Sequence, residues 1–179
     1  MHGRARDFSE IERIALLFIR LEYVLKADAS EGPRALRSAS RHRFHLRRHP
    51  NVSKVSKDGS GKCDAEATGD SEDRVYGVLY SVPESEKRDL DRAEGLGSGY
   101  EEEEIEVHAA GKVVKAFIYR ATSKDAKLRP YHWYKAYVVA GAVEHGLPLG
   151  YIELLRAFES VQDPDSSRRR REQQSLTET

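Results

Sequence analysis

A glutamate at the end of a predicted helix is the residue of this sequence best suited to acid–base chemistry. The charged segment from about Glu84 to Glu94 has helical character and is followed by a glycine-rich run over residues 95–99. Gly95 suits the left-handed position that ends a helix, so Glu94 is predicted to be the last helical residue. The carbonyl end of a helix and burial both raise the pKa of a carboxyl group. Glu94 is therefore a candidate general acid and base, although a solvated surface carboxylate fits the same local pattern.

Two other patterns resemble functional motifs without meeting their requirements. The run Gly59-Ser60-Gly61-Lys62 suggests a phosphate-binding loop, but that motif needs a glycine where Ser56 stands and a serine or threonine where Cys63 stands. His42, His45 and His49 suggest a metal site. Strand alternation places His42 and His45 on opposite faces, and no carboxylate cluster accompanies them. We therefore expect neither a nucleotide nor a metal ion at these positions.

Composition favours a globular domain in a reducing compartment. The 179 residues include 30 basic and 30 acidic side chains, so net charge gives no reason to expect a nucleic-acid partner. The basic segment 34–49 contains Phe44 as its single aromatic residue, which is weak support for nucleic-acid binding. Cys63 is the only cysteine, which excludes an intrachain disulfide and favours the cytoplasm. The apolar run 14–19 is too short to span a membrane, and no signal peptide is evident.

The pattern of apolar residues predicts an α+β domain with a mostly antiparallel sheet. Strands are expected near residues 42–48, 63–68, 74–82, 100–109 and 113–119. Helices are expected over residues 9–27, 84–94, 130–146 and 149–159, although the segment 16–25 would also suit a buried strand. Residues 28–40 and 50–62 are predicted to be loops. The division into domains is an atypical N-terminal helix and loop (1–41), a folded domain (42–160) and a disordered charged tail (161–179).

Four segments in order resemble one known family. They are Lys57-Asp58-Gly59-Ser60-Gly61-Lys62-Cys63-Asp64-Ala65-Glu66-Ala67-Thr68-Gly69, Arg74-Val75-Tyr76-Gly77-Val78-Leu79-Tyr80, Leu90-Asp91-Arg92-Ala93-Glu94-Gly95 and Gly146-Leu147-Pro148-Leu149-Gly150-Tyr151. Together they resemble the gamma-glutamylcyclotransferases, over roughly residues 41–159. The resemblance implies that the sheet closes into a small barrel of about five to six strands, with the active cavity at one mouth.

The same resemblance implies a cofactor-independent reaction that cyclises a γ-glutamyl amine or amino acid to 5-oxoproline and releases the amine. Glu94 matches the family's general acid and base. Tyr134, in Trp133-Tyr134-Lys135, matches a tyrosine that contacts the glutamyl head group, and Tyr100 is a further candidate for lining the cavity. The expected partner is thus a small γ-glutamyl molecule, and a monomer or a homodimer is expected. Which amine is released, and whether glutathione-derived compounds are substrates, stays open.

The N-terminal region departs from the family's pattern. Members carry a Tyr-Gly-Ser-Asn loop after their first strand, whose backbone amides hold the substrate and the developing oxyanion. Residues 1–41 contain no Tyr-Gly-Ser sequence. The alternative hypothesis is therefore a non-catalytic relative that keeps the scaffold and binds a small ligand or a protein.

Overall fold

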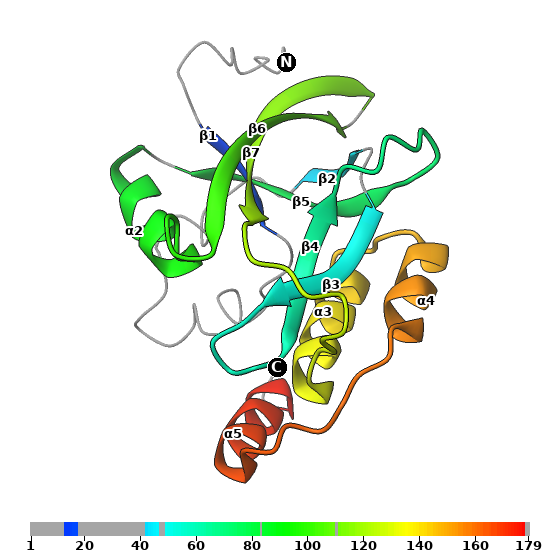
Figure 1. The fold of residues 1–179 in the computed structure, drawn as a ribbon. Coiled ribbons are helices and arrows are strands. Elements are labelled where there is room, and N and C mark those ends of the chain that lie inside the picture. The colour runs from blue at the N-terminus through cyan, green and yellow to red at the C-terminus, as the bar shows by residue number, and fades with distance from the viewer. Residues whose placement is uncertain (1–12, 18–41, 47–48, 83, 110, 178–179) are drawn as a thin grey trace, which may run out of the picture.

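The computed structural model describes residues 13–17, 42–46, 49–82, 84–109 and 111–177 (Figure 1). The strands are β1 (Arg13–Leu17), β2 (His42–Leu46), β3 (His49–Val55), β4 (Gly61–Glu66), β5 (Val75–Val82), β6 (Tyr100–Ala109) and β7 (Lys112–Ala121). The helices are α2 (Glu84–Glu94), α3 (His132–Glu144), α4 (Leu149–Ala157) and α5 (Ser166–Thr177). The predicted α+β class is confirmed.

Five strands pair in the order β1-β5-β2-β6-β7, and β1 also pairs with β7. The order of pairing therefore closes on itself. The β1–β7 pair is parallel and the other pairs are antiparallel, as predicted for most of the sheet. Alternate residues of β6 and β7 point to the inner face of this sheet, where they form part of one apolar cluster. The cluster contains Ala65, Val75, Leu79, Ile105, Val107, Ala109, Ala116 and Ile118.

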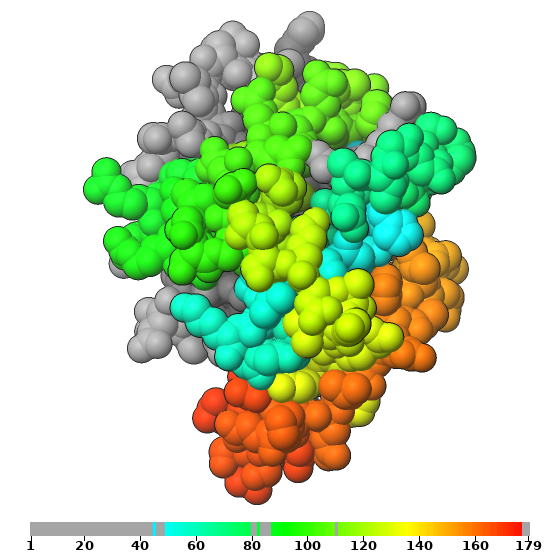
Figure 2. Space-filling view, in the orientation of Figure 1, coloured from blue at the N-terminus to red at the C-terminus, as the bar shows by residue number. Residues whose placement is uncertain are grey.

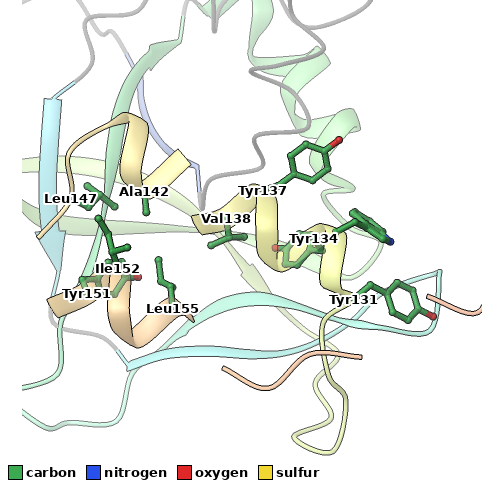
Figure 3. Packing of buried hydrophobic residues seen from close by; sticks show 10 residues of the cluster. Tyr131, Tyr134, Tyr137, Val138, Ala142, Leu147, Tyr151, Ile152 and Leu155 are labelled. Carbon is green, nitrogen blue, oxygen red and sulfur yellow. The ribbon is translucent and has the colours of Figure 1, made fainter. Parts of the chain in front are cut away.

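The β3–β4 pair forms a separate two-stranded sheet that lies between the five-stranded sheet and the C-terminal helices (Figure 1). Helices α3 and α4 pack together around a second apolar cluster that is rich in aromatic residues (Figure 3). Helix α5 lies at the end of the molecule away from the β6–β7 hairpin (Figure 2). The β3–β4 pair therefore connects the two parts of the core.

The N-terminal prediction is wrong where the structure tests it. Residues 13–17 form a strand, paired with β5 on one side and β7 on the other, rather than part of a helix. A short apolar run suits a strand with neighbours on both sides as well as a helix, and here long-range pairing decides. Strand β1 belongs to the same sheet as β5 and β7. The remaining residues of the predicted N-terminal helix and loop lie outside the described residues.

Two further segments predicted to be irregular are ordered. Residues 49–55, within the predicted loop, form β3, which pairs with β4 across an irregularity between Asn51 and Lys54. Residues 166–177, within the tail predicted to be disordered, form α5. Asp165 caps this helix, because its carboxylate accepts the backbone N–H groups of Ser167 and Arg168 at 2.9 and 3.0 Å.

Candidate active site

Glu94 is the last residue of α2, as predicted, and the turn that follows it is formed by glycine. Gly95 has a φ of 78°, and the backbone N–H of Leu96 donates to the carbonyl of Asp91 at 2.9 Å. These two features define a Schellman-type helix end. The Glu94 side chain is buried, with an exposed fraction of 8%. Burial excludes the solvated surface carboxylate that the sequence left open.

The face of α2 that carries Glu94 is charged and largely buried, with Asp91 half-buried. Leu90 and Asp91 each lie three or four residues from both Lys87 and Glu94, so the four residues share one side of the helix. The Lys87 ammonium forms ion pairs with Asp91 and, at 2.5 Å, with Glu102 of β6. Lys87 is only 4% exposed, so these partners replace the water that its ammonium loses on burial.

Tyr119 of β7 completes this cluster. Its hydroxyl donates to Asp91 at 2.6 Å and lies 3.3 Å from the Lys87 ammonium. Burial raises the pKa of Tyr119, and so do the bond to Asp91 and the negative charges of Asp91, Glu94 and Glu102. Glu94 thus acts electrostatically on the same hydroxyl that anchors α2 to the β6–β7 hairpin.

Tyr134 lies in the first turn of α3 and is 5% exposed. Its hydroxyl accepts the backbone N–H of Cys63 in β4 at 3.1 Å. Burial raises the pKa of Tyr134 well above its usual value, so the hydroxyl keeps its proton. Burial likewise raises the pKa of the Cys63 thiol, so Cys63 is an unreactive neighbour of the hydroxyl. Figure 3 shows Tyr134 within the aromatic cluster on α3.

Tyr100 is the first residue of β6 and directly follows the glycine-rich turn. It is 7% exposed, and its carbonyl accepts the backbone N–H of Gly97 at 2.9 Å. Across the hairpin Tyr100 pairs with Ala121, whose N–H donates to the buried carboxylate of Asp64 at 3.2 Å. Asp64 also pairs with Lys124 at 2.5 Å.

Two consecutive residues of β4 therefore connect the two candidate tyrosines. Cys63 binds the Tyr134 hydroxyl through its backbone, and Asp64 binds the backbone opposite Tyr100. Glu94 is joined to Tyr100 by the five-residue turn 95–99. All three predicted site residues are buried, and they lie on elements that meet around β4 and the β6–β7 hairpin.

Sequence reasoning missed the charged partners of these residues. The Lys87–Asp91 pair was detectable, because the two residues are spaced four apart on a predicted helix. Glu102 and Tyr119 were not, because only the register of β6 and β7 makes them direct neighbours. Among the described residues, no group of three or more histidine, cysteine or acidic side chains could hold a metal ion. Within that same part of the chain, no helix has the length and apolar character needed to cross a bilayer.

Comparison with known proteins adds a family relationship. The sequence model of the AIG2-like family matches residues 74–155. A human gamma-glutamylcyclotransferase is 37% identical over 89 residues, which cover 49% of this chain and 47% of the relative. The bovine gamma-glutamylcyclotransferase is 35% identical over the same shares. The chain thus spans about half the length of the curated relatives that it matches.

Solved structures show the same fold over a longer part of the chain. A gamma-glutamyl cyclotransferase structure has a TM-score of 0.69 at 22% identity, covering 93% of this chain and 99% of the other. The structure of an uncharacterised human protein has a TM-score of 0.70 at 24% identity, covering 83% and 89%. At these identities the likeness concerns the fold.

Proposed function

We propose that this chain catalyses the cyclisation of a γ-glutamyl amine or amino acid to 5-oxoproline, because residues 74–155 match the AIG2-like family and 89 residues are 37% identical to a human gamma-glutamylcyclotransferase. The observation that supports this most strongly is the buried Glu94 at the glycine-ended terminus of α2. In this proposal the pairing order of β1, β5, β2, β6 and β7, which closes on itself, corresponds to the small barrel of that family, and we place the site at one mouth of it.

The proposed reaction is an intramolecular acyl transfer. The α-amino nitrogen of the substrate attacks its own γ-carbonyl carbon, a C–N bond forms to close the five-membered ring, and the original amide C–N bond breaks. Two protons of the starting α-ammonium group end on the released amine, which leaves as an ammonium ion. The reaction is redox-neutral and consumes no water, so the protein has to position the chain and move protons.

Glu94 is proposed to perform both proton transfers. Its carboxylate would accept a proton from the attacking ammonium and then return a proton to the leaving nitrogen. A buried position favours this role, because a carboxyl group shielded from water exchanges protons with the substrate rather than with solvent.

Tyr134 and Tyr100 are proposed to contact the glutamyl head group. Both are buried, and both are tied to β4: the Tyr134 hydroxyl accepts the Cys63 N–H, and the strand partner of Tyr100, Ala121, donates to Asp64. Rigid aromatic side chains with a polar end suit the recognition of a small zwitterionic ligand.

The test is 5-oxoproline release by the purified chain from a panel of γ-glutamyl amino acids. Substrates with an acylated α-amino group are the matched control, because the blocked nitrogen cannot attack the carbonyl. Release from the free substrates and none from the acylated ones is expected. No release from any substrate would contradict the proposed activity and favour the non-catalytic alternative.

A further inference from the structure

Two buried lysines face each other across the β3–β4 pair. Lys54 of β3 and Lys62 of β4 are register partners, so their side chains leave the same face of the two-stranded sheet. Their exposed fractions are 7% and 4%. Lysine is rarely buried to this extent unless its ammonium is paired or stacked, so both positions call for a structural explanation.

The Lys62 ammonium lies in a cage of aromatic rings. It is 4.5 Å from the centre of the Tyr134 ring, 4.6 Å from that of Trp133 and 5.7 Å from that of Tyr131. The side chains of Asp58 and Ser60 each accept a hydrogen bond from it at 2.8 Å. The ammonium is therefore fixed from one side by polar groups and presents its charge to the Tyr134 ring on the other.

Lys54 has the equivalent relationship to the other candidate tyrosine. Its ammonium lies 4.6 Å from the centre of the Tyr100 ring. Its Cε atom lies 4.0 Å from the position that a Cβ atom on Gly99 would occupy, so the lysine also packs against the turn that follows Glu94.

From these contacts we infer that Lys54 and Lys62 are positioning residues for the substrate site, holding Tyr100 and Tyr134 respectively at a fixed separation. This inference rests on the proposed function for its effect on catalysis, but the structural relationship stands on its own. Both lysines lie on the hydrogen-bonded strands β3 and β4, so the distance between the two ammonium groups is set by this strand pair. The distance between the Tyr100 and Tyr134 rings is set in turn by the two ammonium groups. A cation over a ring face attracts the ring and restricts its movement.

The experiment compares Lys54→Met and Lys62→Met with Lys57→Met. Methionine keeps the length and apolar stem of lysine but removes the charge. Lys57 is exposed in the turn between β3 and β4, so its variant controls for a lost lysine in the same hairpin. With a γ-glutamyl amino acid as the probe, each of the first two variants is expected to raise KM about tenfold with kcat nearly unchanged, because the tyrosines bind the head group while Glu94 moves protons.

The second readout needs no activity. Fluorine NMR of protein labelled with fluorotyrosine, assigned through Tyr100→Phe and Tyr134→Phe, reports each ring separately. Lys62→Met is expected to shift and broaden the Tyr134 resonance, and to change the near-UV circular dichroism of Trp133, which is the only tryptophan. Lys54→Met should move the Tyr100 resonance alone, and Lys57→Met should move neither. If Lys62→Met does not fold, Asp58→Asn weakens the polar anchor of the same ammonium and should move the Tyr134 resonance.

The outcomes separate this inference from the proposed function. If the wild type is inactive but the methionine variants show the expected ring shifts, the proposed enzymatic activity is wrong. The inference that the lysines position the two tyrosines then still holds. An active wild type whose KM and ring resonances are unchanged in both methionine variants would overturn the positioning role. A lower kcat together with a lower stability, at an unchanged KM, would mean that the lysines support folding in general. That result would also overturn the positioning role.

Discussion

The Tyr119 hydroxyl donates a 2.6 Å hydrogen bond to Asp91, and this bond ties the β6–β7 hairpin to the helix that ends at Glu94. Asp91 precedes Glu94 by three residues and lies on the same face of α2. The Lys87 ammonium pairs with Asp91 and lies close to the Tyr119 hydroxyl. The position of Glu94 therefore depends on a bond between two side chains that the substrate would not need to touch.

Tyr119→Phe is expected to reduce the free energy of unfolding by about 1 kcal/mol at neutral pH, because the hydrogen bond to Asp91 is lost. Burial, the bond to Asp91 and nearby negative charge raise the pKa of Tyr119 above the value near 10 of an unfolded tyrosine. The Tyr119 hydroxyl therefore keeps its proton to a higher pH in the folded state than in the unfolded state. The resulting stabilisation is fully present below pH ~10 and is lost as the pH rises toward the folded pKa.

Urea unfolding of both proteins at neutral and alkaline pH measures this effect. Above pH ~10 the wild type should lose stability more steeply than Tyr119→Phe, by up to about 1.4 kcal/mol per pH unit. Burial also raises the pKa of Tyr134 and Tyr151, so the variant should keep part of the slope. Identical slopes for the two proteins would show that Tyr119 ionises normally in the folded state.

Gly95→Ala is expected to cost about 1–2 kcal/mol of stability and to reduce activity, because φ at this position is 78°. The new Cβ atom would make only an ordinary 3.7 Å contact with the Ser98 carbonyl, so the cost comes from the backbone. Gly111→Ala is the matched control. Its φ is 75° and its Cβ atom would contact nothing within 4 Å, but it lies in the β6–β7 turn rather than beside Glu94.

Thermal unfolding and 5-oxoproline release distinguish these two glycine variants. Similar losses of stability are expected in both, with a loss of activity in Gly95→Ala alone. Equal activity in the two would mean that the helix end does not position Glu94.

Asp163→Asn is expected to detach α5 from α3. The Asp163 carboxylate is buried, binds Arg168 through two contacts of 2.6 Å and accepts the Trp133 indole N–H at 2.8 Å. The Arg168 bond, assisted by the Trp133 bond, lowers the pKa of Asp163 to about 2. An amide replaces charge-assisted bonds with weaker ones, so a loss of about 2–3 kcal/mol is expected.

Hydrogen exchange checks this prediction, because amides of α5 should lose protection before those of α3. Because the folded pKa is depressed, the stabilisation from Asp163 is present above pH ~4 and is lost as the pH falls toward 2. Asp89→Asn, which changes an exposed carboxylate on α2, is the control. Unchanged protection of α5 in Asp163→Asn would refute the role of this carboxylate.

The parts of the fold that local signals determine were predictable. The bounds of α2 followed from its charged helical sequence and from the glycine that ends it. The strand at residues 13–17 was not predictable, since its apolar run suits two structures and pairing with residues 75–82 and 112–121 selects one. Helix α5 has no apolar face, so composition indicated disorder. The buried Asp163 carboxylate and the hydrogen bond that the Tyr137 hydroxyl donates to the Glu172 carbonyl at 2.9 Å hold it in place.

The candidate site shows the same division. Glu94, Tyr100 and Tyr134 were identified from short motifs, and each is buried. Lys54 and Lys62 were missed because lysine is usually a surface residue, and only the register of β3 and β4 brings them under the tyrosine rings.

The most direct test of the account is 5-oxoproline release by Glu94→Gln compared with the wild type and with Glu106→Gln. Glutamine keeps the size of the buried side chain but cannot exchange a proton, whereas Glu106 is exposed on β6. The account predicts normal turnover by the wild type and Glu106→Gln, and a fall in kcat of about 10²–10⁴-fold in Glu94→Gln with an unchanged melting temperature. Turnover by a folded Glu94→Gln at the wild-type rate would contradict the role of Glu94 as the general acid and base.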